Sequence, residues 1–409
     1  MIKRLIKILS IVFLIFFITI IYLSVFGIKT NKFNNKIINS ILRIDKNINL
    51  NLEDVKYLLN PYNLSVDIKT KNPKISIEGK SIEIREIKTN IALRSLINNE
   101  FSIDYLKFEI KKIKLNDIIT FGRVFQNSSQ LFILNTIIKD GFISANVNVN
   151  FDDKGNIKKN YQIDGLVNEA KLNILNKLKL QNLNLNFNIT HNNILLERIG
   201  MKLNDIKITS PKVEIEKKKN LFFVNGQFLN EEKNIDINEL EPIFVNLPKD
   251  IDIKKIKFSS KNNFSFDISK KLKFDNFKIK SIIQLKELVF NKKDLKLNSY
   301  FPSFAEEIRL IKNKITINYN KKKFDIEGSG DVLLQEKSDN LFYKINKSKN
   351  NLLFDLKMNF KNNSLLIGFL DYKKKEGLDS IVSIKGNLKK NNQLNFNLIN
   401  LKEKNNEIS

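Results

Sequence analysis

Most of the chain alternates between apolar and polar residues, and the clearest example is the segment 182–189. Its odd-numbered positions are apolar and its even-numbered positions are asparagine. Successive side chains of a β-strand point to opposite faces, so this pattern predicts a strand with one apolar and one polar face. Similar segments recur from residue 63 to the C-terminus, separated by pairs such as Asn192-Asn193 that are typical of tight turns. We therefore predict a mainly β fold of antiparallel strands.

The N-terminal segment 8–28 breaks this pattern, because it carries no charge between Lys7 and Lys29. At a rise of about 1.5 Å per residue, a helix of this length just crosses a hydrocarbon core of about 30 Å. We predict an uncleaved transmembrane signal anchor over 8–28, after a cytoplasmic N-terminus of residues 1–7. The anchoring side chains are Ile8, Ile11, Phe13, Leu14, Phe16, Phe17, Ile20, Ile21, Tyr22, Leu23 and Phe26.

Two other interpretations of this segment remain open. A cleaved signal peptide would use Lys3, Arg4 and Lys7 as its charged region, but the apolar run exceeds the usual length of about 7–15 residues and no A-x-A-like site follows it. A helix of a soluble protein is the third possibility. Lysines lie on both sides of the segment, so charge does not fix its orientation. We favour an N-terminus in the cytoplasm and the remaining chain outside it.

Helical spacing interrupts the alternation in two places. In the juxtamembrane region 29–62 it predicts short helices over 36–44 and 52–59, the second ended by Asn60-Pro61. A second helical interruption is predicted over 115–139. There, Ser128 or Ser129 can cap a helix from Leu131 to Lys139 that Gly141 would end. Because this helix is apolar nearly all round, we expect it to be buried against the sheet.

Composition excludes several classes of function. The 409 residues contain no cysteine, so disulfides and thiolate chemistry are excluded. The net charge of +26 reflects a chain rich in Lys, Asn and Ile throughout. Lysines cluster at 217–219, 321–323 and 373–375, between apolar segments, where solvated turns are expected. We therefore predict no nucleic-acid partner, whereas attraction to anionic lipid head groups stays open.

No motif indicates catalysis, a cofactor or a metal. The segment 328–331 is rich in glycine, but an apolar strand pattern follows it, so a turn or bulge is favoured over a phosphate-binding loop. The run 152–156 lacks the spacing of a calcium loop. His191, the single histidine, has no second histidine with which to share a metal. We predict that the protein is not an enzyme and holds no cofactor.

Many strands with one apolar face raise a physical problem, since a single open sheet would leave a long apolar surface in water. The strands can stack as a sandwich, close as a barrel, or curl into a trough occupied by lipid chains.

Several segments resemble the AsmA-like family, which includes TamB and YhdP. After the anchor come Asn72-Pro73-Lys74-Ile75-Ser76-Ile77, the segment 87–96 reading IKTNIALRSL, and the helical interruption leading to Gly141-Phe142-Ile143. The segment 300–369 looks most like the YhdP branch. The resemblance implies an inner-membrane protein with a single span and the bulk of the chain in the periplasm. Members often run longer, so the chain is expected to be a short member or to be incomplete at Ser409.

The resemblance further implies an elongated, curled antiparallel β-groove over 63–409. Such a groove would bind phospholipid acyl chains and conduct phospholipid between inner and outer membranes, or support outer-membrane assembly, with other envelope proteins as further partners. The alternative is a structural or scaffolding domain of the envelope with a filled core. The expected groove-lining residues are Ile143, Val147, Val149, Leu183, Leu185, Phe187, Ile189, Phe264, Phe266, Ile268, Ile315, Ile317, Phe354 and Leu356.

Overall fold

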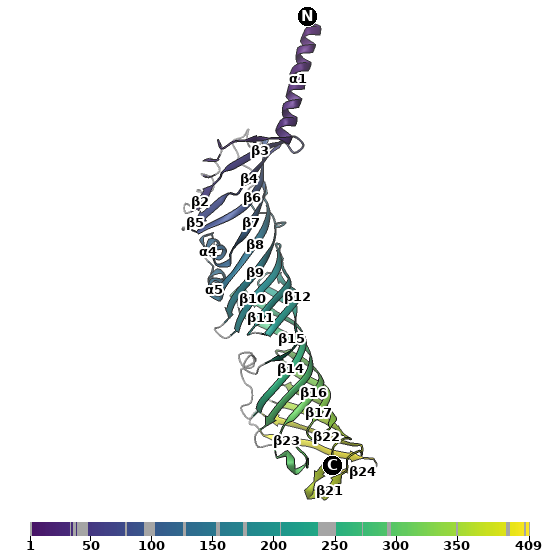
Figure 1. Ribbon diagram of the computed structural model, residues 1–409. Coiled ribbons are helices and arrows are strands. Elements are labelled where there is room, and N and C mark those ends of the chain that lie inside the picture. Colours follow the sequence, from purple (N-terminus) through teal and green to yellow (C-terminus); the bar gives the residue numbers. More distant parts are fainter. Residues whose placement is uncertain are drawn as a thin grey trace. The chain divides into compact units, whose positions relative to one another are not determined.

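The computed structural model is mainly β, as the alternation predicts, and its paired strands are antiparallel (Figure 1). Hydrogen bonds place 22 strands in one sheet, and β20 and β21 form a separate ladder. The structure describes the chain except residues 1, 33, 36–37, 39–47, 78–79, 94–102, 126–127, 153–155, 175–177, 205, 236–250, 272, 293–295, 349–350, 390–392, 405 and 409.

The N-terminal helix α1 (Ile2–Val25) is long and apolar enough to cross a membrane. An 18-residue window within Lys3–Val25 has a mean hydropathy of 2.9, and none of that window is buried. The hydroxyls of Thr19 and Ser24 donate to the carbonyls of Ile15 and Ile20 at 2.8 and 2.7 Å, so both polar groups are satisfied within the helix. This arrangement suits an apolar surrounding.

The end of α1 differs from the predicted boundary. Gly27 adopts a φ of 63°, and the amides of Phe26 and Gly27 both donate to the carbonyl of Tyr22. A left-handed glycine at this position is a common helix stop. Phe26 therefore lies in a turn and Ile28 begins β1, while the helix starts before the predicted Ile8.

Two compact units make up the chain. Unit 1 comprises residues 1–173 and 182–196, and unit 2 comprises residues 174–181 and 197–409. Three strands contribute residues to both, namely β9 (Gln162–Ile174), β10 (Leu178–Ile189) and β11 (Asn193–Leu203).

In unit 1 the main ladder pairs β1 with β3, then β4, β6, β7, β8 and β9 in turn. A second ladder pairs β2 with β5, and β5 with the first residues of β6. The remaining elements of this unit are β1 (Ile28–Lys29), β2 (Ile48–Asn51), β3 (Asp54–Asn60), β4 (Ser65–Lys71), β5 (Lys74–Ile77), β6 (Lys80–Ala92), β7 (Ile103–Lys114), α4 (Leu115–Phe125), α5 (Ser129–Ile137) and β8 (Ile138–Asn150).

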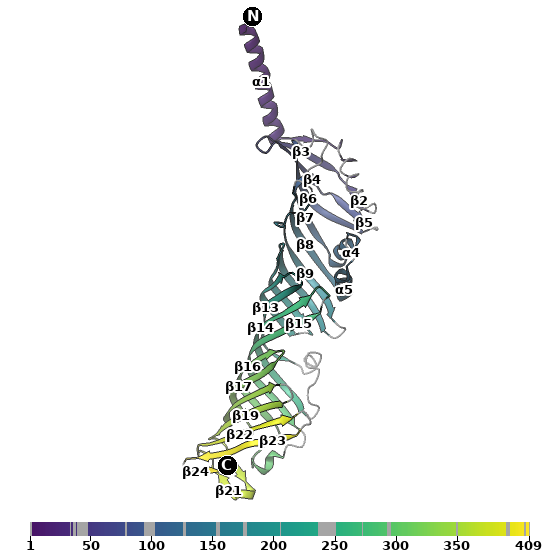
Figure 2. The same cartoon turned by 180° about the vertical axis from the view of Figure 1, so that it is seen from behind.

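In unit 2 the strands from β12 to β19 pair with their sequence neighbours, and β19 then pairs with β22 (Figure 2). β22 pairs with β23, and β23 with β24. The elements are β12 (Ile206–Lys217), β13 (Leu221–Ile235), β14 (Ile251–Ser269), β15 (Phe274–Lys292), η1 (Leu297–Ser299), β16 (Ile308–Asn320), β17 (Lys323–Leu333), β18 (Ser338–Ser348), β19 (Asn351–Phe360), β20 (Leu365–Ile367), η2 (Gly368–Leu370), β21 (Tyr372–Lys374), β22 (Ser380–Lys389), β23 (Leu394–Glu403) and β24 (Asn406–Ile408).

The predicted helix over 52–59 is wrong, because these residues contain most of strand β3. Val55, Tyr57 and Leu59 alternate, and each pairs with a residue of β4. The pairing overrides a spacing that also fits one helical turn. The other predicted juxtamembrane helix, 36–44, falls almost entirely outside the described residues.

The predicted helical interruption is present as α4 and α5. The prediction is wrong about where the second helix ends and about which of the two helices is buried. Ser128 caps α5, its hydroxyl accepting from the amide of Leu131 at 3.3 Å. The helix ends at Ile137, and Gly141 lies inside β8. Contrary to the expectation of a buried helix, Phe132 of α5 is 58% exposed, and it is α4 that buries Leu115 and Ile119.

Candidate binding site

An apolar cavity of about 550 Å³ lies in unit 1 between the two ladders and helix α4. Its volume falls within the range of small-molecule sites. Among the described residues, no charged side chain lines it, and the polar side chains that do are two threonines. The lining residues are Leu50, Leu52, Val55, Ile68, Thr70, Ile75, Ile82, Ile84, Ile87, Thr89, Ile103, Leu106, Phe108, Ile110, Ile118, Phe121 and Phe151.

Strand β6 creates the cavity by belonging to both ladders. Residues 80–83 pair with β5, whereas residues 86–92 pair with β4. Ile82 and Ile84 sit near this divergence and are 3% and 4% exposed. The β2–β5 ladder is thus a second layer over the apolar face of the main ladder.

Helix α4 supplies another wall of the cavity, through Ile118 and Phe121. The helix is held to the sheet by a cluster of Leu115, Ile119, Ile138 and Ala170. Gly141, at a φ of 128°, permits this contact, since an added Cβ would lie 2.6 Å from the Cα of Ala170 and 2.9 Å from Leu115. The interruption predicted from helical spacing therefore forms part of the site.

Two of the predicted groove residues, Val147 and Val149, are connected by strand pairing to residues that line the cavity. Val147 pairs with Phe108, which pairs with Ile87; Val149 pairs with Leu106. Paired residues of neighbouring strands share a face. Both valines therefore lie on the apolar face that the cavity occupies, although neither lines the cavity.

The other predicted residues of unit 1 are placed differently. Ile143 and Leu183 pack against the cluster beneath α4, so they are part of a filled core. Phe187 lies over Gly165, and Leu185 and Ile189 are half-buried on the same strand.

The predicted residues of unit 2 share one apolar face. Ile317 is connected through Ile326 and Ile345 to Phe354 by successive strand pairs. In the same way, Ile315 is connected through Gly328 and Tyr343 to Leu356. Phe264, Phe266 and Ile268 alternate on β14, and Phe264 pairs with Ile279, which pairs with Tyr319.

Aromatic rings on this face lie flat over glycines of the neighbouring strand. A Cβ added to Gly328 would be 2.2 Å from Cζ of its partner Tyr343, and one added to Gly386 would be 2.4 Å from Cζ of its partner Phe354. Gly226 and Phe264 repeat the arrangement, as do Gly165 and Phe187. The rings cover backbone and so project little into the space over the sheet. Burial raises the pKa of Tyr343 to about 12.

The apolar face of unit 2 is not unbroken, contrary to the sequence expectation. Asn262 is 6% exposed and donates to the hydroxyl of Ser260 at 2.6 Å, and Ser260 in turn donates to Asn230. Ser281, also 6% exposed, pairs with Asn262. These small polar residues interrupt the aliphatic and aromatic surface between Phe258 and Phe264.

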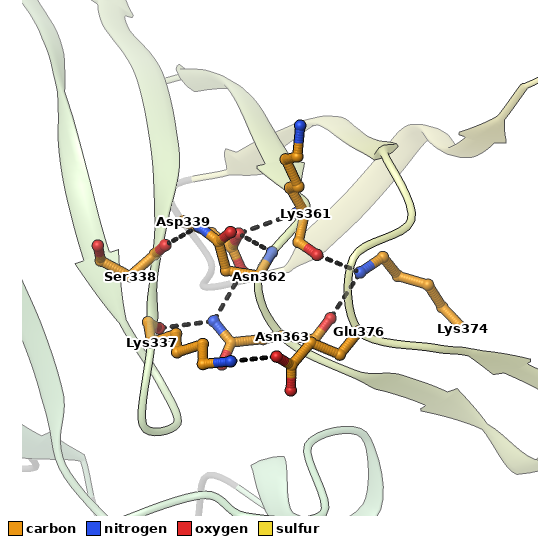
Figure 3. A network of polar contacts seen from close by, with 8 residues as sticks. All are labelled: Lys337, Ser338, Asp339, Lys361, Asn362, Asn363, Lys374 and Glu376. Atoms are coloured by element: carbon orange, nitrogen blue, oxygen red, sulfur yellow. Dashed lines mark hydrogen bonds and ion pairs between the residues drawn. The ribbon is translucent and has the colours of Figure 1, made fainter.

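One end of unit 2 is closed by a filled core and a polar network (Figure 3). Phe301, Val332, Leu334, Phe360, Leu365 and Leu401 form the core. Beside it, Asp339 accepts from the amides of Lys361 and Asn362 at 2.9 and 2.8 Å. Lys374, 1% exposed, donates to the carbonyls of Lys361 and Asn363 at 3.2 and 2.6 Å. The network fastens segment 361–379 over this end.

The described residues contain no group of His, Asp and Glu side chains that could hold a metal. His191 lies in a turn, with its ring edge-on to Tyr161 at 6.0 Å between centroids. Gly328 and Gly330 belong to strand β17. The predicted turn or bulge over 328–331 is wrong in position, because the extra residue lies opposite, between Ile311 and Lys314 of β16.

The residues that line the cavity were not among those predicted from the sequence. Leu50 lies in the short strand β2, which follows residues that the structure does not describe, and Leu52 lies between β2 and β3. Helical spacing concealed the role of Leu52 and of Val55 in β3. A usable signal was the change of parity in β6, from Ile82 and Ile84 to Ile87 and Ile91, where the pairing passes from β5 to β4.

Comparison with family models, with curated proteins and with solved structures finds no match to this chain.

Proposed function

We propose that this chain is a membrane-anchored lipid-binding protein whose cavity in unit 1 and apolar sheet faces hold acyl chains. The observation that carries the proposal is the cavity of about 550 Å³, whose described lining consists of apolar side chains and two threonines. An acyl chain needs no polar partner, and its transfer from water into such a site is favourable by about 0.8 kcal/mol per CH₂.

The wider role is also part of the proposal. A single inner-membrane span formed by α1, a periplasmic location for the remaining chain, and membership of the AsmA-like family would together make it a conductor of phospholipid between inner and outer membranes or a support of outer-membrane assembly. The half-buried apolar faces of both units favour it, since a route for lipid must stay accessible. No catalytic step is proposed.

Photo-crosslinking tests the site directly. A photoreactive residue in place of Phe108 points into the cavity, whereas the same residue in place of Lys107 lies on the opposite, exposed face of β7. We expect the full-length protein in membranes to crosslink phospholipid acyl chains from position 108 and not from position 107. Equal labelling from both positions, or none from either, would refute lipid binding in the cavity.

A filled-core scaffold is the second candidate, favoured by the filled clusters beneath α4 and around Phe301. Ile87→Trp separates the two, because the added ring occupies the cavity. Lipid binding predicts less co-purified phospholipid from a folded variant, with Lys107→Trp as the surface control. A filled-core scaffold predicts that the parent protein and both variants co-purify with almost no phospholipid.

A further inference from the structure

The turns at one edge of unit 2 are rich in lysine. The β12–β13, β14–β15, β16–β17, β18–β19 and β22–β23 turns lie at the same edge of unit 2. The strand register places them there, because the strand that leaves one of these turns pairs, close to the turn, with the strand that enters the next one. All described lysines of these turns are exposed. This basic edge consists of Lys217, Lys218, Lys219, Lys270, Lys271, Lys273, Lys321, Lys322, Lys323, Lys347 and Lys389.

Few carboxylates accompany these lysines. In the described part of the turns and the adjoining strand ends they are Glu216, Asp267, Asp275 and Asp325. Glu216, Asp275 and Asp325 lie within 3.5 Å of Lys218, Lys321 and Lys323, and Asp267 accepts from the side-chain amide of Asn276 at 2.6 Å. At the opposite edge, by contrast, carboxylates are frequent and ion-paired, as in Lys254–Glu307 at 2.8 Å and Lys257–Glu232 at 2.9 Å. The charge of unit 2 is therefore sorted between its two edges.

A row of aromatic rings runs across the apolar face to the basic edge. From Phe228 the row continues through Phe264 and Phe266, with 5.9 Å between successive centroids. It then passes through Phe274 and Phe277 to Tyr319 and Phe324, at 5.5 to 6.3 Å. Near the edge the rings are open to solvent, with Phe274 66% and Tyr319 42% exposed.

We propose that unit 2 binds amphiphiles with an anionic head group, placing the acyl chain on the aromatic row and the head group at the basic edge. The inference rests on the proposed function, because it assumes that the apolar face holds acyl chains. The two halves of the site match the two halves of such a lipid. Flexible lysine ammonium groups bind phosphate as point charges without demanding one geometry.

The test compares phosphatidylglycerol with phosphatidylcholine of identical acyl chains, bound to the detergent-solubilised full-length protein. Both carry a phosphate, but only phosphatidylglycerol has a net negative charge. Exposed ion pairs contribute about 0.2–1 kcal/mol each, so three lysines correspond to roughly a three- to a hundredfold preference at low salt. We expect a preference for phosphatidylglycerol in this range, falling as salt rises from about 0.05 to 0.5 M.

Two triple variants with the same change in charge locate the effect. Lys217→Gln, Lys219→Gln and Lys322→Gln alter the basic edge. Lys280→Gln, Lys314→Gln and Lys357→Gln alter exposed lysines within strands of the same unit. We expect the edge variant to lose the preference while phosphatidylcholine binding is unchanged, and the control variant to keep it. All six side chains are exposed, so both variants should fold.

The outcomes separate this inference from the proposed function. No binding of either lipid by the parent protein defeats the proposed function. Equal binding of both lipids, or equal loss of preference in both variants, overturns the basic edge and leaves the apolar site intact. Inorganic phosphate serves as a further probe: if it binds the parent but not the edge variant while lipid binding is the same in both, the edge is a site for free phosphate and the inference is wrong.

Discussion

Units 1 and 2 build the same kind of apolar sheet face but cover it differently. In unit 1 the β2–β5 ladder and α4 lie over the face, so that Val55, Ile82 and Ile84 are 1%, 3% and 4% exposed around a cavity. In unit 2 the described residues cover the face mainly near Phe301, and Phe277 and Tyr319 remain 41% and 42% exposed. Period-two alternation thus sets which face is apolar, while elements outside the alternation decide whether that face is covered to form a cavity or remains an open surface.

A charge placed on each face should have the largest and most unequal effect. Ile84→Asp puts a carboxylate among described side chains that include no cation, and we expect it to destabilise unit 1 by about 3 kcal/mol or more. Phe277→Asp, at a partly exposed position, should cost unit 2 less than about 1 kcal/mol. Hydrogen exchange of the full chain in detergent reports each unit separately. Equal losses of protection would mean that the two faces are covered alike.

Glycine substitutions test a device that the two units share. Gly165→Ala in unit 1 and Gly328→Ala in unit 2 would each push an aromatic ring off the backbone that it covers. Overpacking of this kind costs about 1–3 kcal/mol. Gly200→Ala is the matched control, because nothing lies within 4 Å of its added Cβ and its backbone is not left-handed; it should be neutral or slightly stabilising.

Denaturant midpoints followed by circular dichroism measure these three variants. If Gly328→Ala unfolds at the same denaturant concentration as Gly200→Ala, the Tyr343 ring leaves its place at no cost and the flat packing is not a constraint.

The sequence predicted which face of a strand is apolar better than it predicted which elements cover that face. Val147, Ile317 and Phe354 could be assigned to an apolar face because a strand fixes the direction of alternate side chains. These features depend only on local geometry.

The cover depends on contacts between distant segments, and there the sequence misled. Segment 52–59 carries apolar residues at both helical and strand spacing, and only its partner β4 decides between them. Helix α5 is apolar nearly all round, yet it lies outward because α4 occupies the place against Ala170. Asn262 and Ser281 pair with each other and are both buried, although polar residues are expected on the solvent-facing side of a strand.

The smallest effect on stability is expected at the end of unit 2 that segment 361–379 covers. Polar contacts hold this segment in place, whereas apolar contacts hold the covering elements of unit 1. Burial lowers the pKa of Lys374, although Asp339 and nearby carboxylates oppose the shift. The unfolded chain regains the ordinary pKa of 10.5 and so binds more protons than the folded chain between the lowered value and 10.5. Stability of this end should therefore rise as the pH increases through that window, and the penalty is fully present below it.

Lys374→Met removes both the titration and two hydrogen bonds. It should destabilise the end of unit 2 by about 1–2 kcal/mol at neutral pH and flatten the rise in stability. Lys373→Met, on the exposed face of the same strand, is the control and should behave like the parent. Unfolding is best compared below pH 10, because above it Tyr372 contributes with the opposite sign: burial and Glu403 raise its pKa to about 12, so the unfolded chain loses that proton first. Parallel pH profiles for the parent and Lys374→Met would show that the ammonium is not disfavoured in the fold.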